Sequence, residues 1–202
     1  MSFWENTRKP VGLGGKLMVS LMNLGHSPVA WWGLRFLNVA PDAKVLDCGC
    51  GGGANIKRLL KKCPQGIVKG IDYSPVSVEK SQRVNAGAIA KGRCTILQGS
   101  VAKRIFAEGW FDAVTAFETV YFWPELPQCF HEIHRMLKPG GMFLICNESS
   151  GDTDKDEKWT KIIDGMTIYK DVELKADLEQ AGFRDVQIHK NKWGWLCVTA
   201  RK

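Results

Sequence analysis

The chain lacks a long apolar run, a basic leader segment and a regular cysteine framework. No stretch approaches the roughly 18 apolar residues of a membrane-spanning helix, and residues 1 to 8 do not combine a basic segment with an apolar one. The seven cysteines are an odd number and stand singly in expected strands, helices or a glycine-rich loop, which indicates reduced thiols. We therefore expect a soluble cytoplasmic protein without a membrane partner.

The chain also lacks a concentrated basic tract, although its net charge is +7. Lysine and arginine are scattered, and one expected helix carries Lys57, Arg58, Lys61 and Lys62. Such helix faces are more typical of a solvated surface than of a phosphate track, so we do not expect a nucleic-acid partner. The length of 202 residues and the 45% hydrophobic content fit one domain, residues 1–202, with an appendage.

The appendage is the N-terminal segment, residues 1–40. Residues 1 to 12 are polar and broken by proline and glycine, which predicts a flexible arm. Leucines at helical spacing predict a helix over 13–24, and Ser27 with Pro28 predicts the start of a second, aromatic helix over 27–38. We expect this helical pair to pack on the domain and to form a lid over a ligand pocket.

From residue 41 onward, short apolar runs alternate with helical patterns. The alternation predicts an α/β fold with a doubly wound, mostly parallel sheet and helices on both faces. The last two strands are joined by only four residues, so they should pair antiparallel. Residues 149–170 are charge-rich and should form a surface excursion with a helical turn near Trp159. We expect seven strands, at 44–48, 67–72, 94–98, 111–117, 141–147, 183–189 and 194–201, and helices at 54–62, 75–88, 101–107, 125–137 and 171–181.

A glycine-rich loop follows the first of these strands. The strand ends in Asp47, four glycines lie between 49 and 53, and a helix begins near Ala54. A loop poor in side chains lets a ligand approach the backbone, and the helix N-terminus attracts anions, which predicts a nucleotide site. The loose dinucleotide fingerprint G-x-G-x-x-A is present, but a carboxylate at Asp47 suits a cationic amine. The chain also has only one glycine set and one ribose acid, which argues against a nicotinamide enzyme.

Four motifs in order resemble those of class I S-adenosylmethionine-dependent methyltransferases. They are Val45-Leu46-Asp47-Cys48-Gly49-Cys50-Gly51-Gly52-Gly53, Gly70-Ile71-Asp72-Tyr73-Ser74, Phe111-Asp112-Ala113-Val114 and Met136-Leu137-Lys138-Pro139-Gly140-Gly141. The resemblance covers residues 40 to 148 and extends to the helix before the final hairpin. It implies a Rossmann-like methyltransferase fold, S-adenosyl-L-methionine as cofactor and S-adenosyl-L-homocysteine as product.

The resemblance also implies which residues bind the cofactor. Asp72 should accept both ribose hydroxyls, and Asp47 should hold the methionine ammonium unless it merely braces the loop. Ser100 stands where the family often has an acid that meets the adenine amine, so this contact is weakened. The complete implied set is Asp47, Gly49, Cys50, Gly51, Asp72, Tyr73, Ser74, Gly99, Ser100, Val101 and Phe117.

The segment from Phe117 to Trp123 should lie where cofactor and acceptor meet. It contains no Asn-Pro-Pro-Tyr motif, no Pro-Cys nucleophile and no acidic metal set, which favours a small-molecule acceptor and no metal. Glu118 and Tyr121 are the first candidates for catalysis, although capping and packing are equally good explanations, and His26 is a candidate base. His131 and His134 are interpreted as surface residues.

Two other functions stay open from the sequence. One is methylation of an RNA or protein acceptor, and the other is non-catalytic binding of S-adenosylmethionine by a sensor or partner subunit. The sequence does not distinguish a monomer from a homodimer.

Overall fold

The computed structural model describes residue 10 and residues 12–202, so most of the predicted N-terminal arm lies outside the described residues. Its centre is a seven-stranded sheet in the order β3-β2-β1-β4-β5-β7-β6. β7 runs antiparallel to β5 and to β6, and the other neighbours pair in parallel. The predicted fold class is confirmed. The strands are β1 Lys44–Cys48, β2 Ile67–Asp72, β3 Cys94–Gln98, β4 Phe111–Phe117, β5 Leu137–Asn147, β6 Arg184–Lys190 and β7 Leu196–Arg201.

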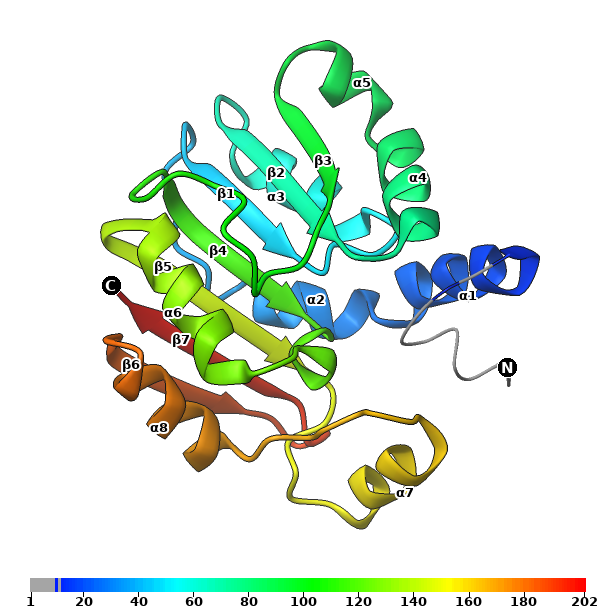
Figure 1. The fold of residues 1–202 in the computed structure, drawn as a ribbon, viewed down its shortest axis with the longest axis vertical. Helices are drawn as coiled ribbons and strands as arrows, with labels where there is room; N and C mark the ends of the chain where they lie inside the picture. Colours follow the sequence, from blue (N-terminus) through cyan, green and yellow to red (C-terminus); the bar gives the residue numbers. More distant parts are fainter. Residues whose placement is uncertain (1–9, 11) are drawn as a thin grey trace.

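Helices cover both faces of this sheet (Figure 1). One buried cluster packs α2 and α3 against one face, and a second packs α6 and α8 against the other. Successive residues of β1 show the alternation, because Val45 belongs to the first cluster and Leu46 to the second. The helices are α1 Gly12–Gly25, α2 Ser27–Gly33, α3 Ala54–Lys62, α4 Pro75–Val84, α5 Ala86–Ala90, the 3-10 turn η2 Val120–Phe122, α6 Leu126–Met136, α7 Asp154–Ile162 and α8 Asp171–Gln180.

Three predicted helices differ from those observed. The helix expected over 27–38 ends at Gly33, after which Phe36 stacks on His189 at 3.9 Å between ring centroids. The helix expected over 75–88 divides at Asn85, whose side-chain amide donates to the carbonyl of Gly53 at 3.1 Å. Residues 101–107 form turns instead of a helix. In the first two cases, contacts between distant parts of the chain override local propensity.

The α1 helix is present, but its predicted leucine stripe faces outward. Leu17, Leu21 and Leu24 are 55%, 50% and 75% exposed, whereas Met18 and Val19 are buried. The buried side of α1 packs toward α4 and the carboxyl ends of the strands. None of the described helices is long and apolar enough to cross a membrane.

Candidate active site

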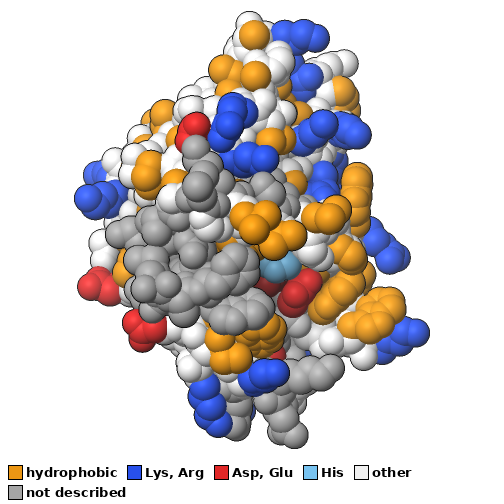
Figure 2. Space-filling model, turned by 90° about the vertical axis from the view of Figure 1, so that its right-hand side faces the viewer, with side chains coloured by type: hydrophobic (Ala, Val, Ile, Leu, Met, Phe, Trp, Pro, Cys, Tyr) orange, Lys and Arg blue, Asp and Glu red, His pale blue; other side chains and the backbone are white. Residues whose placement is uncertain are grey.

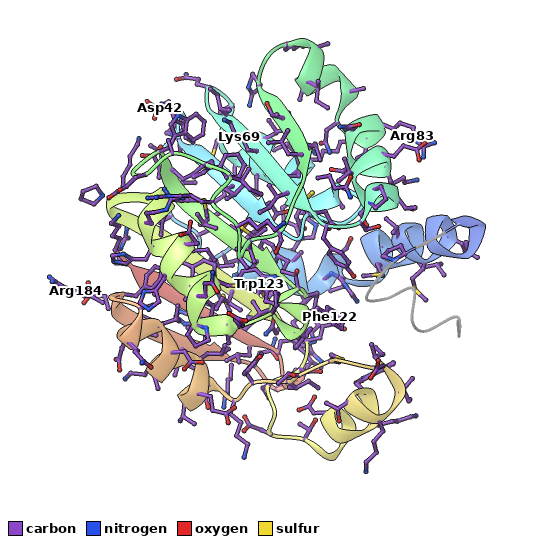
Figure 3. The ribbon with its side chains drawn as sticks, viewed as in Figure 1. Asp42, Lys69, Arg83, Phe122, Trp123 and Arg184 are labelled. Atoms are coloured by element: carbon purple, nitrogen blue, oxygen red, sulfur yellow. The ribbon has the colours of Figure 1, made fainter. Side chains whose placement is uncertain are left out.

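A pocket of about 410 Å³ opens at the carboxyl edge of the parallel strands. On the face seen in Figure 2, hydrophobic side chains gather around a histidine, with acidic side chains beside it. Phe122 and Trp123, which line the pocket, are labelled in Figure 3 just beyond β4. Val19, Met22, His26 and Val29 also line it. The N-terminal helices therefore form part of the pocket wall.

The glycine loop between β1 and α3 forms one wall of the pocket. Gly49 has a φ of +73°, and a Cβ atom there would lie 2.0 Å from the hydroxyl oxygen of Thr119, so only glycine fits. The amides of Gly49 and Cys50 donate to the carbonyl of Ile71 at 2.8 and 3.0 Å. These bonds hold the loop against the end of β2, and Gly49 to Gly52 all line the pocket.

Asp72, the last residue of β2, lies at the centre of this wall. Its two carboxylate oxygens accept hydrogen bonds from the amides of Gly51 and Ser74, both at 2.9 Å. A carboxylate offers about four acceptor positions, so two remain for ribose hydroxyls. Burial raises the Asp72 pKa, and the two backbone hydrogen bonds partly counter it.

Asp47 occupies a different position from the one expected of an ammonium ligand. It is buried, it is absent from the pocket lining, and one oxygen accepts the Thr115 hydroxyl at 2.7 Å. Burial raises its pKa to about 7. This geometry supports the bracing role that the sequence left as the alternative, with Asp47 joining β1 to β4 beneath the loop.

The expected adenine side is only partly assembled as predicted. Tyr73, Gly99, Ser100 and Val101 line the pocket. Ser74 does not line it, because its buried side chain caps α4, accepts the Ser77 amide at 3.4 Å and donates to the Pro10 carbonyl at 3.2 Å. Ser74 was expected among the cofactor-binding residues, and in the structure its side chain orders the start of a helix.

The expected acceptor side contains Phe117, Glu118 and His26, all of which line the pocket. Glu118 has a positive φ of +57°, which turns the chain sharply after β4. Burial raises the Glu118 pKa well above its ordinary value, the nearby Glu148 raises it further, and hydrogen bonds from the Glu148 amide and from Tyr121 oppose this. Burial lowers the pKa of His26, which favours the neutral imidazole.

Tyr121, a candidate for catalysis, does not line the pocket, which favours the packing role that the sequence left as the alternative. Its buried hydroxyl accepts the Ser149 amide at 3.0 Å, and burial raises its pKa well above the ordinary value. Tyr121 instead ties η2 to the segment after β5. His131 is exposed as expected, but His134 is half-buried with its ring 5.1 Å from that of Phe183.

Sequence reasoning missed Arg58 and Glu148. Arg58, interpreted as solvated surface, lines the pocket, donates to Asn55 at 2.7 Å and lies over the Trp31 ring at 5.5 Å. Its position one turn into the helix after the glycine loop could have indicated this. Glu148 lies directly after β5. One of its carboxylate oxygens, a carboxylate oxygen of Glu118 and a ring nitrogen of His26 lie within 4.8 Å of one another. Glu118 and Glu148 are far apart in sequence, and they become neighbours because β4 and β5 are adjacent in the sheet.

The sheet order, the antiparallel β7, the glycine loop and the acid at the end of β2 define a class I S-adenosylmethionine-dependent methyltransferase fold. Residues 46–145 match the family described as a methyltransferase domain. The chain belongs to the class I S-adenosylmethionine-dependent methyltransferases.

Among curated proteins, the chain is similar to sterol-modifying enzymes of plants. It is 30% identical over 159 residues to cycloartenol-C-24-methyltransferase of Arabidopsis thaliana, covering 73% of this chain and 46% of the relative. It is 33% identical over 109 residues to cycloartenol-C-24-methyltransferase 1 of Oryza sativa subsp. japonica, covering 54% and 31%. The chain thus spans less than half the length of these two relatives.

Solved structures share the fold at low identity. A methyltransferase solved in complex with the Haloferax volcanii Trm112 activator has a TM-score of 0.84 at 20% identity, covering 93% of each chain. Phosphoethanolamine N-methyltransferase 2 of Haemonchus contortus, bound to S-adenosyl-L-methionine, has a TM-score of 0.79 at 14% identity, covering 100% of this chain and 60% of the other. The [4+2]-cyclase SpnF has a TM-score of 0.72 at 18% identity, covering 87% and 80%. The fold is therefore shared by proteins with different activities.

Proposed function

We propose that the chain transfers the methyl group of S-adenosylmethionine to a small-molecule acceptor by in-line displacement, without a metal ion. The observation that carries this proposal is the continuity of one pocket. The same 410 Å³ cavity is lined by the glycine loop and Asp72 on one side and by Phe117, Glu118 and Trp123 on the other. Cofactor and acceptor would thus meet within one continuous pocket.

We assign the cofactor half to the glycine loop and its neighbours. Asp72 would accept the ribose hydroxyls through its two remaining acceptor positions, while Tyr73, Gly99, Ser100 and Val101 would border the adenine. Cys50 and Phe117 complete this wall. Arg58 is the added candidate, since a guanidinium suits the carboxylate of the cofactor's amino acid. Asp47 would support the loop from below.

Methyl transfer from S-adenosylmethionine requires mainly that the protein align the two reactants and exclude water. The sulfonium is an activated donor, so holding the acceptor in line with the methyl group and excluding water supply most of the rate. The α1 and α2 helices would exclude water, as Met22 and Val29 line the pocket. Two of the curated relatives are named as cycloartenol-C-24-methyltransferases, which supports a small organic acceptor.

Calorimetry with the pure protein tests the proposal. We expect S-adenosylmethionine and S-adenosylhomocysteine both to bind, and mixtures with small amines, thiols, phenols and carboxylates to yield S-adenosylhomocysteine for one class. No binding of either compound would refute the proposal. Binding without turnover on any acceptor would favour a non-catalytic cofactor-binding protein, and binding to RNA that weakens steeply with salt would favour an RNA acceptor.

The remaining proposals concern organisation. We propose one domain over residues 1–202, with residues 1–40 as the lid and residues 149–170 as a surface excursion, acting in the cytoplasm as a monomer or homodimer. The walls that α1 and α2 contribute to the pocket support the lid. Limited proteolysis with and without S-adenosylhomocysteine tests it, because cofactor should protect the N-terminal segment if the lid closes over the site.

A further inference from the structure

Three ionisable side chains from distant parts of the chain meet at the acceptor end of the pocket. The ring of His26, between α1 and α2, and the carboxylates of Glu118, after β4, and Glu148, after β5, have ligand atoms within 4.8 Å of one another. His26 and Glu118 line the pocket. We refer to these three residues as the acidic triad.

The two carboxylates of the acidic triad are held together by the backbone. The Glu118 amide donates to the Cys146 carbonyl at 2.9 Å, and the Glu118 carboxylate accepts the amide of Glu148. Among the described residues, the side chains that act on the Glu118 carboxyl are Glu148, another acid, and Tyr121, a neutral phenol. Two acids fixed side by side in a partly buried site repel each other, and a cation between them would relieve that repulsion.

Aromatic rings border the same end of the pocket. Phe117, Phe122 and Trp123 line it, and ring faces attract cations, alkylated ammonium groups in particular. A site that combines carboxylates with aromatic walls is suited to an organic cation more than to a neutral alcohol or an anion. The apolar side chains of Met22 and Val29 would accommodate the rest of such a molecule.

We infer that the acidic triad binds the ammonium group of an amine acceptor, so that nitrogen receives the methyl group. This inference rests on the proposed function and names its substrate class. It predicts that an amine is recognised in its cationic form and released as a methylated ammonium ion, which the same carboxylates and rings also fit.

The reaction balances with the groups present. The bound ammonium loses one proton to the Glu118 carboxylate or to the His26 imidazole, which frees the nitrogen lone pair. That lone pair forms a bond to the methyl carbon of S-adenosylmethionine, while the carbon–sulfur bond breaks and leaves its electron pair on sulfur. The products are S-adenosylhomocysteine and the methylated ammonium ion, and the proton passes to solvent. The raised Glu118 pKa suits proton acceptance by its carboxylate.

Calorimetry with three probes of equal chain length tests the inference: hexylammonium, hexanol and hexanoate. With S-adenosylhomocysteine bound, hexylammonium should bind at least about tenfold more tightly than hexanol, as one charge-assisted interaction gives, and hexanoate should bind least. Glu148→Gln should reduce the preference for hexylammonium to less than about threefold. Glu108→Gln, at an exposed glutamate, is the matched control and should keep the preference.

Several outcomes separate the possibilities. Equal binding of hexylammonium and hexanol, or a preference that survives both Glu148→Gln and Glu118→Gln in variants with wild-type melting temperatures, would overturn the inference. Tight binding of Mn²⁺ or Zn²⁺ alone, lost in Glu148→Gln, would overturn it in favour of a metal site. If S-adenosylhomocysteine does not bind, the proposed function fails, whereas a preference for hexylammonium in the cofactor-free protein would still support the inference.

Discussion

Replacing Asp47 with asparagine should stabilise the protein progressively as the pH rises from about 4 to about 7. The folded-state pKa of Asp47 is raised from 3.8 to about 7, chiefly by burial. An acid with a raised pKa holds its proton in the folded state across this window and loses it in the unfolded state. The wild-type protein therefore loses stability as the pH rises through the window, and asparagine, which cannot ionise, does not.

The magnitude follows from the difference between the two pKa values. Each pKa unit corresponds to about 1.4 kcal/mol, so the difference between 3.8 and about 7 is equivalent to about 4 kcal/mol. Asparagine keeps an oxygen that can accept the Thr115 hydroxyl, which now lies 2.7 Å from Asp47. The asparagine side chain also adds an N–H donor, and burying that donor lowers the free energy of unfolding by an amount that does not depend on pH. The quantity to compare between the two proteins is therefore how their free energies of unfolding change with pH.

Urea unfolding followed by tryptophan fluorescence at about pH 4, 6 and 8 measures this difference. The free energy of unfolding of Asp47→Asn minus that of the wild type should rise by about 4 kcal/mol across the series. Asp112→Asn is the control of opposite sign, because Lys138 and the Lys44 amide lower the Asp112 pKa, so its removal should cost stability above about pH 4. Parallel wild-type and Asp47→Asn curves would show that Asp47 is ionised when folded, as an ammonium ligand would be.

Three further predictions concern the pocket and the N-terminal helix. Asp72→Ala should weaken S-adenosylhomocysteine binding by on the order of 2 kcal/mol, about thirtyfold, because two acceptor positions are lost; unchanged affinity in calorimetry would place the ribose elsewhere. Gly49→Ala should lower the free energy of unfolding by at least about 2 kcal/mol, and Gly51→Ala, which meets nothing within 4 Å, should cost less in the same urea assay. Leu17→Ser should change stability by less than about 0.5 kcal/mol, whereas Met18→Ala should cost at least about 2 kcal/mol; similar losses would mean that the leucine stripe is buried.

The positions of the glycine loop and of Asp72 could be predicted because their determinants are local. The positive φ of Gly49 and the amide of Gly51 follow from a strand, a tight loop and a helix that are adjacent in sequence. Asp72 follows from one more parallel strand, and right-handed crossovers bring the ends of such strands to one edge. Short-range chemistry and a general rule of topology were sufficient here.

The differences from expectation have a common physical origin in packing between segments that are not adjacent in sequence. Ser74 and Tyr121 have residue types suited to ligand contact, but each hydroxyl is bonded to a distant segment, to the Pro10 carbonyl and the Ser149 amide respectively. The direction of α1 is a similar case, because Met18 and Val19 form a second apolar stripe beside the leucines and the fold buries that one. Periodicity locates a helix but does not choose between two apolar faces.

The proposed acceptor half is assembled partly from segments that the family match does not cover. Residues 46–145 match the methyltransferase domain, yet His26 and Glu148, two of the three members of the acidic triad, lie outside that range. Glu118 lies inside it but gains its raised pKa from burial and from Glu148. The family match therefore covers the glycine loop and Asp72, whereas under the proposed function α1, α2 and the segment after β5 would determine what is methylated. Relatives that share the core and differ in these three segments should differ in acceptor, and exchanging the segments should alter acceptor preference while S-adenosylhomocysteine affinity stays the same.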